Sequence, residues 1–212
     1  MTVVIADYGM GNVASIENMC RRLGPPVKVS STREDLLAAS RIILPGVGAF
    51  DEAMQTLRSL GMDDSVRTAA ARGTPILGLC LGMQILLESS EEGTHAGLGL
   101  IPGTCRRFPS SIGDRRLLVP HMGWNRVTPT VPSPYLARLG ESGSRYYFVH
   151  SFYAEPTDAS DVSGTTDYGI RFPSAIARGN VVGVQFHPEK SHRYGMQLLG
   201  SFLTTSTALG EE

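Results

Sequence analysis

The sequence predicts an α/β fold: a central, mostly parallel sheet flanked by helices, with an antiparallel portion added in the second half. Two observations support this fold class. In roughly the first ninety residues, short apolar runs alternate with amphipathic stretches, as in parallel strands joined by crossover helices. In the second half, apolar runs of strand length follow one another with only turns between them. The 212 residues show no internal repeat and no convincing linker, so residues 1–212 are expected to form a single domain.

The first half contains three predicted strands, each followed by a predicted helix. Val3–Ala6, Ile42–Leu44 and Pro75–Leu79 are short and apolar, as buried parallel strands are. The residues after each strand are apolar at helical spacing, and the third helix is expected to begin directly after Cys80. A Gly-Pro-Pro sequence at 24–26 ends the first helix. The apolar helix positions are Val13, Ile16, Cys20 and Leu23, then Phe50, Met54, Leu57 and Leu60, then Met83, Leu86 and Leu87.

The second half is predicted to supply four strands and a closing helix. The strands are Arg116–Val119, Arg145–Tyr153, Ser174–Arg178 and Val181–Phe186. The helix carries Tyr194, Leu198 and Phe202. Periodicity does not determine which strands are neighbours, so the strand order stays open.

Composition and charge narrow the class of protein. The chain is 42% hydrophobic and 18% charged with a formal net charge of −1, which disfavours a nucleic-acid partner. The amino terminus has no basic region, and no apolar run reaches the roughly 18 residues of a membrane span. The three cysteines are too few and too scattered for a disulfide framework or a zinc site, and no cluster suggests a metal or another cofactor. A cytoplasmic enzyme is the expected class.

The segment Gly78-Leu79-Cys80-Leu81-Gly82 predicts a nucleophile. It follows a predicted strand and opens a predicted helix, the context in which a glycine-x-nucleophile-x-glycine pattern acquires meaning. The flanking glycines let strand and helix approach without Cβ clashes. The amino-terminal amides of the helix favour a Cys80 thiolate, and the amide of Leu81 is placed to donate to an oxyanion. The alternative is a structural cysteine buried in a glycine-flanked turn.

His187 is the histidine best placed to act as the base. Of the five histidines, it alone follows a strongly apolar strand and has a carboxylate two residues later. Residues i and i+2 of an extended chain point the same way, so Glu189 can reach the imidazole, select its tautomer and support the imidazolium. The alternative is a surface His-Pro-Glu turn. The cysteine at position 80 favours the catalytic arrangement of Cys80, His187 and Glu189.

These residues stand in two segments, GLCLGMQ at 78–84 and FHPE at 186–189, by which the chain resembles the class I glutamine amidotransferases. The resemblance implies a flavodoxin-like fold and hydrolysis of L-glutamine to glutamate and ammonia through a γ-glutamyl thioester on Cys80. It also implies an oxyanion site shared by the amide of Leu81 and the loop that contains Val47 and Gly48. The amide of Val47 is expected to rotate toward the oxyanion, which the adjacent Gly46 and Gly48 make easy.

A closer resemblance, to the glutaminase subunits of imidazole glycerol phosphate synthase, extends from Val3 to Phe202. It rests on DYGMGN at 7–12, PGVGAF at 45–50, HMGWN at 121–125, YFVHSFY at 147–153, TDYG at 166–169 and GVQFHPEKS at 183–191. This resemblance implies a heterodimer with a cyclase subunit, a (β/α)8 barrel. The cyclase receives the ammonia directly and forms imidazole glycerol phosphate and aminoimidazole carboxamide ribotide in histidine biosynthesis.

The same resemblance implies the residues that bind L-glutamine. Gln84 matches the position whose side chain holds the substrate, and Glu92 is a candidate to bind its α-amino group. His150 and Ser151 are expected beside the substrate carboxylate, largely through their backbone. Structural alternatives remain: Gln84 as a solvated helix residue, Glu92 as a solvated charge at a helix end, and His150 as a strand histidine with satisfied hydrogen bonds.

Four residues are predicted to face the cyclase. Lys190 directly follows the carboxylate of Glu189, and Trp124 is the only tryptophan in the chain. An exposed tryptophan beside a lysine is typical of an interface. Asn12 and Tyr147 belong to the other subfamily segments and are expected at the same mouth. The alternative places Trp124 in the core and leaves Lys190 as a solvated charge.

Three other functions remain open. The first is a glutaminase subunit of another pathway, such as pyridoxal phosphate synthesis, although DYGMGN and HMGWN are not expected there. The second is a cysteine hydrolase on the same fold, which the presence of Gln84 and Glu189 disfavours. The third is a non-catalytic flavodoxin-like binding module. A dinucleotide site is rejected because Gly9-Met10-Gly11 lacks the further glycine of that fingerprint.

Overall fold

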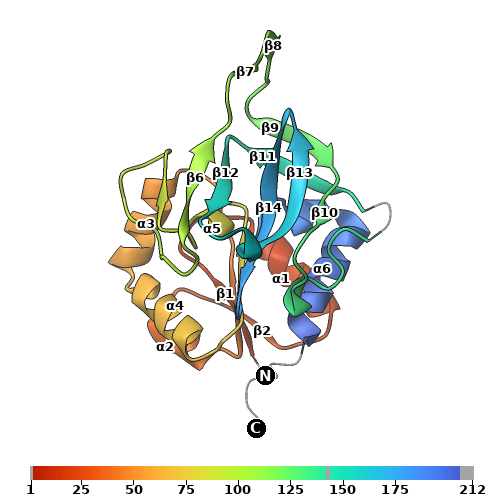
Figure 1. Cartoon of the computed structure of the whole chain (residues 1–212). Helices are drawn as coiled ribbons and strands as arrows, with labels where there is room; N and C mark the ends of the chain where they lie inside the picture. The colour runs from red at the N-terminus through yellow and green to blue at the C-terminus, as the bar shows by residue number, and fades with distance from the viewer. Residues whose placement is uncertain (1, 142–143, 206–212) are drawn as a thin grey trace.

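The computed structural model describes residues 2–141 and 144–205, and its centre is an eight-stranded sheet (Figure 1). The strands lie in the order β10-β13-β14-β15-β4-β3-β1-β2. The parallel strands are β1 (Val3–Ala6), β2 (Val27–Ser30), β3 (Arg41–Leu44), β4 (Ile76–Leu79) and β15 (Val181–Val184). The antiparallel strands are β10 (Thr128–Pro129), β13 (Val162–Tyr168) and β14 (Ile170–Arg178). Residues 1, 142–143 and 206–212 of the predicted domain lie outside the described residues.

Helices cover both faces of this sheet (Figure 1). One face carries α2 (Arg33–Ala38), α3 (Phe50–Ser59) and α4 (Met62–Ala71), and the other carries α1 (Val13–Arg22) and α6 (His192–Thr204). The strand order β2-β1-β3-β4 between two helical layers is that of a flavodoxin-like sheet, so the predicted fold class is confirmed. Across residues 2–141 and 144–205, no helix is both long and apolar enough to cross a bilayer.

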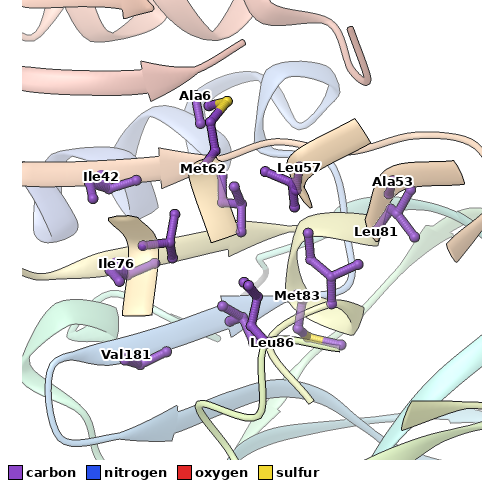
Figure 2. Packing of buried hydrophobic residues seen from close by; sticks show 14 of the residues in the cluster. Ala6, Ile42, Ala53, Leu57, Met62, Ile76, Leu81, Met83, Leu86 and Val181 are labelled. Carbon is purple, nitrogen blue, oxygen red and sulfur yellow. The ribbon is translucent and has the colours of Figure 1, made fainter. Parts of the chain in front are cut away.

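The core beneath α3 and α4 holds the segment that follows the predicted nucleophile (Figure 2). Ile42 of β3 and Ile76 of β4 are fully buried in one cluster with Leu57 of α3. Leu81, the first residue of the one-turn helix α5 (Leu81–Gln84), belongs to the same cluster and is 2% exposed. Because Leu81 is anchored in this core, the turn that carries Cys80 is held against the sheet.

Shorter strands surround the edge of the sheet at which the parallel strands end. β9 (His121–Asn125) pairs antiparallel with β11 (Tyr146–His150), and we call this pair the β9–β11 ribbon. β6 (Gly103–Arg107) pairs with β12 (Phe152–Pro156) and with β5 (Ser89–Ser90). A small hairpin of β7 (Ser111–Ile112) and β8 (Arg115–Arg116) projects at the top of Figure 1. The 3-10 turns are η1 (Pro134–Leu136), η2 (Ala159–Asp161) and η3 (Pro188–Lys190).

The strands and helices predicted for the first half are present, but four further elements were missed: β2, α2, α4 and the two-residue strand β5. β2 is an edge strand whose side chains are mostly half-exposed, so it lacks a continuous apolar run. α2 has only six residues. α4 is rich in alanine, serine and threonine, so its apolar face is weakly marked.

The helix predicted after Cys80 is wrong in its length. α5 ends at Gln84, before the apolar residues Leu86 and Leu87. The backbone carbonyls of residues 85–87 accept hydrogen bonds from the amides of Leu98, Leu100 and Gly99 at 2.8–3.1 Å. These carbonyls are therefore occupied by a neighbouring loop, and the helix does not continue.

All four strands predicted for the second half are also corrected, whereas the closing helix is confirmed as α6. Arg116–Val119 is not a strand beyond Arg116, because the side chain of Leu117 packs near Gly169 at the β13–β14 turn instead of in a sheet. Arg145–Tyr153 is divided at Ser151 into β11 and β12, which belong to different sheets. β15 ends at Val184 rather than at Phe186, and β14 begins before the predicted Ser174.

Candidate active site

Three adjacent parallel strands carry the predicted site at their carboxyl ends. The loop Pro45–Gly48 follows β3, Cys80 follows β4, and His187 lies three residues beyond β15. Because β3, β4 and β15 are neighbours, these three segments meet at one edge of the sheet. They border a pocket of about 330 Å³. The pocket is lined by Val47, Gly48, Cys80, Leu81, Gln84, Glu92, Pro120, Val149, His150, Ser151, Phe152 and His187.

The pocket thus contains every predicted oxyanion and substrate residue together with Cys80 and His187. Sequence reasoning missed Pro120, Val149 and Phe152, which are apolar and carry no chemical signal of their own. Glu189 lies behind His187 and does not line the pocket.

Cys80 sits on a sharp turn that glycine makes possible. Its backbone has φ +54° and ψ −109°, a conformation that costs a non-glycine residue about 1–3 kcal/mol. A Cβ atom on Gly82 would lie 1.8 Å from the carbonyl oxygen of Leu44, and one on Gly78 would lie 2.5 Å from the carbonyl oxygen of Gly82. Only glycine fits at both flanking positions, so the strained turn depends on them.

His187 and Glu189 form a buried pair beside Cys80. The imidazole Nδ1 lies 2.8 Å from Oε1 of Glu189, and each side chain is 3% exposed. The carboxylate accepts, so Nδ1 carries a proton, and Nε2 is the ring nitrogen left for Cys80. Nε2 makes no hydrogen bond within the described part of the chain. The backbone amide of His187 donates to the carbonyl of Tyr147 at 2.9 Å and fixes the position of the ring.

The surroundings of His187 favour its protonated form. Burial acts to lower the pKa of the imidazole, but interactions with Cys80 and Glu189 outweigh it and raise the pKa to about 10. An imidazolium beside a cysteine is the arrangement that stabilises a thiolate.

The predicted oxyanion donor Leu81 is occupied within the protein. Its backbone amide donates to the carbonyl oxygen of Gly46 at 3.3 Å. A Cβ on Gly46 would lie 2.8 Å from the amide nitrogen of Gly82, and Gly48 has φ +112°. Beneath the loop, the buried hydroxyl of Tyr8 donates to the carbonyl of Pro45. In this conformation the Gly46 carbonyl takes the donor that an oxyanion would need.

The predicted substrate residues have well-defined partners. Glu92 accepts a hydrogen bond from the amide of Phe50 at 3.0 Å, and burial raises the pKa of its carboxyl. Glu92 lies in the turn after β5, so the alternative that it is a charge at a helix end is wrong. The amide nitrogen of Gln84 already donates to the carbonyl of Phe152 and to Oε1 of Gln185, which leaves the amide oxygen of Gln84 uncommitted among the described residues.

His150 and Ser151 occupy the break between β11 and β12. The His150 ring is 6% exposed and its Nδ1 lies 2.7 Å from the carbonyl of Phe152. Burial lowers the pKa of His150 to about 3, so the ring is neutral. The carbonyl of Ser151 accepts from the amide of Phe108 at 3.0 Å.

Gln185 is a site residue that the sequence prediction did not include. It is fully buried, and its Nε2 lies 3.7 Å from the sulfur of Cys80. A signal was present, because Gln185 is the one polar side chain in the predicted strand Val181–Phe186. The other two cysteines, Cys20 and Cys105, are buried and form no disulfide. No group of three His, Cys, Asp or Glu residues suited to a metal occurs in residues 2–141 and 144–205.

Of the residues predicted to face a partner, Trp124, Tyr147 and Lys190 lie together beside His187. Trp124 is 44% exposed, so the alternative that it belongs to the core is wrong. Its ring stacks on His192 at 5.4 Å, and Nζ of Lys190 lies 5.5 Å from the ring centre of Tyr147. Tyr147 and Trp124 are directly paired in the β9–β11 ribbon. Asn12 caps the start of α1 by accepting from the amide of Ser15.

Met122 extends this surface and was missed. It is 61% exposed and lies two residues before Trp124 in β9, so both side chains point to the same face of the ribbon. The spacing of Met122 and Trp124, two residues apart in HMGWN, already indicated that they share one face of a strand.

Comparison with known proteins identifies the family. The model of the class I glutamine amidotransferases matches residues 4–205. A Pseudomonas aeruginosa protein named imidazole glycerol phosphate synthase subunit HisH 2 is 48% identical over 95% of this chain and 98% of its own. The chain belongs to the HisH family of class I glutamine amidotransferases. The HisH subunit from Moorella thermoacetica is also 48% identical, over 94% of this chain and 93% of its own.

Solved structures agree on the fold of this amidotransferase. The PurLQS structure from Thermotoga maritima matches with a TM-score of 0.72 at 19% identity, over 95% of this chain and 96% of that chain. A glutamine amidotransferase from Thermotoga maritima matches with a TM-score of 0.68 at 16% identity, over 99% of each chain. At these identities the likeness concerns the fold alone.

Proposed function

We propose that this chain hydrolyses L-glutamine to glutamate and ammonia, with Cys80 as nucleophile, His187 as base and Glu189 as the residue that orients the base. The observation that carries this proposal is the buried pair of His187 and Glu189, 2.8 Å apart, at the pocket that contains Cys80. Membership of the glutamine amidotransferase family supports the choice of substrate.

In the first step, Sγ of Cys80 attacks the γ-carboxamide carbon of L-glutamine. The imidazolium of His187 gives its proton to the departing nitrogen, so the C–N bond breaks, ammonia leaves and a γ-glutamyl thioester remains. In the second step, His187 takes a proton from water while the water oxygen attacks the thioester carbon. The C–S bond then breaks, glutamate leaves and the thiolate is restored. Glu189 supports the charge on His187 throughout.

Substrate binding is assigned to the remaining polar groups of the pocket. The carboxylate of Glu92 suits the α-ammonium group of L-glutamine, and the free amide oxygen of Gln84 suits an N–H of the substrate. Because the ring of His150 is neutral and bonded within the protein, His150 and Ser151 contribute through backbone groups.

The oxyanion site requires a change in the loop Pro45–Gly48. Rotation of the peptide between Gly46 and Val47 withdraws the Gly46 carbonyl from the amide of Leu81 and turns the amide of Val47 toward the substrate. Both donors then face the oxyanion. We assign the observed conformation to a resting state, since one donor is occupied by the protein itself.

The partner in this proposal is a cyclase subunit, a (β/α)8 barrel that forms a heterodimer with this chain in the cytoplasm and consumes its ammonia. The name of the relatives, subunits of imidazole glycerol phosphate synthase, supports a complex. The outer face of the β9–β11 ribbon, with Met122, Trp124 and Tyr147, supplies an exposed apolar surface beside the pocket. Lys190 lies beside this surface, with Nζ 5.5 Å from the ring centre of Tyr147, and we assign Asn12 to the same interface.

A glutaminase assay with and without a cyclase subunit and its ligand tests both parts. We expect slow release of glutamate from the isolated chain and a large increase in the complex. Glutamate release that is equal in both samples contradicts the assigned resting state. Absence of release in both contradicts the proposed activity.

A further inference from the structure

Gln185 occupies a position that packing alone does not explain. Its side chain is fully buried, although Val184 and Phe186 on either side of it in the chain are apolar, and its Nε2 lies 3.7 Å from the sulfur of Cys80. A buried amide in an apolar strand is costly unless its donors and acceptor are matched by partners. Here one end of the amide meets the sulfur, and the other meets Gln84.

The direction of the Gln185 amide follows from its neighbours and not from an assignment of hydrogens. A carbonyl oxygen only accepts, so the group of Gln84 that lies 3.1 Å from the carbonyl of Phe152 is its NH2 group. The same NH2 group lies 3.2 Å from Gln185, which must therefore present its oxygen. The NH2 group of Gln185 is then left to face Cys80.

The Phe152 carbonyl connects these amides to a second series of buried hydrogen bonds, and we call the whole series from Asn125 to Cys80 the line. This carbonyl also accepts from Nδ1 of His150 at 2.7 Å, so both of its lone pairs are used. Since Nδ1 of neutral His150 carries the proton, its Nε2 accepts from Nδ1 of His121, 3.0 Å away. Nε2 of His121 in turn accepts from the NH2 group of Asn125, which also donates to the carbonyl of Asp167.

In each hydrogen bond of this line, the donor and the acceptor are defined. Burial lowers the pKa of His121 to about 4 and that of His150 to about 3, so both rings are neutral at pH 7 and the order of donors holds. The line begins at Asn125 in the β9–β11 ribbon, next to Trp124, and ends at the Cys80 sulfur.

We propose that Gln185 is a positioning residue that holds the Cys80 sulfur through an N–H donor, and that Gln84, the Phe152 carbonyl, His150, His121 and Asn125 fix this donor from the ribbon. The proposal rests on the proposed function and adds a residue and a coupling route to it. An N–H that donates to the sulfur stabilises the thiolate and fixes its direction of attack. This contact therefore affects the rate of the chemical step and not the binding of substrate. Because the line starts in the ribbon, a displacement of the ribbon when a partner docks changes the position of the donor at the Cys80 sulfur.

The first experiment compares Gln185→Met and Gln185→Glu with wild type in the isolated chain. The probe is 6-diazo-5-oxo-L-norleucine, an electrophilic analogue of L-glutamine, and the readout is the mass of the Cys80 adduct over time. We expect the limiting rate of modification to fall about tenfold or more for Gln185→Met, as for loss of one hydrogen bond to a charged group. Gln185→Glu is expected to be slower still, because its carboxylate repels the thiolate. The concentration for half-maximal rate should stay within about threefold of wild type, since these contacts act on the chemical step.

Ser65→Ala is the matched control, because Ser65 is buried in α4 and its hydroxyl donates to the carbonyl of Gly61 at 3.1 Å. This variant removes a buried hydrogen bond away from Cys80 and should leave the rate unchanged. Thermal unfolding of all variants shows that the comparison is made on folded protein. If wild type is modified and both Gln185 variants are modified at its rate, the assignment of Gln185 is overturned. If wild type itself is not modified at Cys80, the proposed function fails instead.

The far end of the line is tested by a double-mutant cycle with His121→Phe. Phenylalanine keeps the stacking on Phe148 and Tyr168 but cannot donate to His150. We expect His121→Phe to slow modification of Cys80, and the double variant with Gln185→Met to be no slower than Gln185→Met alone. Effects that multiply, or no effect of His121→Phe, remove the ribbon from the proposal.

Discussion

At the scale of single residues, the site depends on a strained backbone at Cys80, which the flanking glycines permit, and on a positive charge on His187, which burial disfavours. Cys80 is held at a positive φ between Gly78 and Gly82. His187 is buried, yet Cys80 and Glu189 keep its charged form favourable. In the proposed function, Cys80 and His187 are a nucleophile and a base that are prepared before substrate binds.

Cys80→Ala is expected to abolish glutamate release while leaving the chain folded. The thiol is the only group in the proposal that can form the thioester, so at least a thousandfold loss follows from removing a member of a triad. The measurements are glutamate release and denaturant-induced unfolding. Cys20→Ala is the control: Cys20 is fully buried in α1, so we expect a loss of about 1–2 kcal/mol in the free energy of unfolding and near-normal activity. Residual activity of Cys80→Ala within tenfold of wild type contradicts its role.

The protonation of His187 is expected to depend on Cys80. The pKa of His187 is raised to about 10 by Cys80 and Glu189 against the effect of burial, so Cys80→Ala should lower it toward or below its ordinary value near 6.5. A raised pKa means that protonation stabilises the folded state. This contribution is complete below about pH 6.5 and is lost as the pH rises toward about 10. The check is an NMR titration of the imidazole Cε1–H in wild type and Cys80→Ala, and an identical midpoint in both argues against coupling to Cys80.

At the scale of elements, the ends of β3, β4 and β15 decide which segments meet, and the loop after β3 decides whether the site is complete. The Gly46 carbonyl occupies the amide of Leu81, and the hydroxyl of Tyr8, just after β1, holds the carbonyl of Pro45. The loop is therefore tied at its start and free to rotate at its glycines.

Tyr8→Phe is expected to raise the glutaminase activity of the isolated chain. Removing the hydroxyl releases the Pro45 carbonyl and lowers the cost of rotating the Gly46–Val47 peptide, by about 0.5–1.5 kcal/mol for one hydrogen bond, or roughly two- to tenfold in rate. The measurement is glutamate release without a partner. Tyr135→Phe, at another buried tyrosine, is the control. Unchanged or lower activity of Tyr8→Phe shows that the hydroxyl does not restrain the loop.

At the scale of the whole molecule, the pocket lies beside an exposed apolar surface of a kind that is typical of an interface. Met122 and Trp124 are 61% and 44% exposed on the outer face of the β9–β11 ribbon, and their inner-face neighbour His121 is buried in the line that leads to Cys80. Docking and catalysis thus share one ribbon in the proposal.

Lys190→Ala and Trp124→Ala are expected to weaken binding of the cyclase subunit. Lys190→Ala should change the free energy of unfolding of the isolated chain by less than about 0.5 kcal/mol, as for an ordinary surface change. Trp124→Ala should cost more in affinity, because an exposed tryptophan buries much area on docking. The measurements are the Kd of the complex and the ratio of glutamate to imidazole glycerol phosphate formed. Arg72→Ala, exposed at the end of α4, is the control. Affinities and ratios equal to wild type in all three variants place the interface elsewhere.

The sequence by itself determined the fold class, the places of β1, β3 and β4 along the chain and the triad candidates. These features follow from local patterns: apolar runs, helical spacing, and glycines around a cysteine. It also indicated the polar residues of the pocket, because the family motifs contain all of them except Glu92, which the wider resemblance indicated.

Only the tertiary structure decided the strand order, the premature end of α5 and the division of the ribbon from β12 at Ser151, since each depends on partners distant in the chain. The same holds for the exposure of Trp124, for the Gly46 carbonyl at the amide of Leu81 and for the direction of the Gln185 amide. A hydrogen bond between residues about a hundred positions apart, such as that between Gln84 and Gln185, leaves no periodic trace in a sequence. It exists because the β4 and β15 strands are neighbours in the sheet.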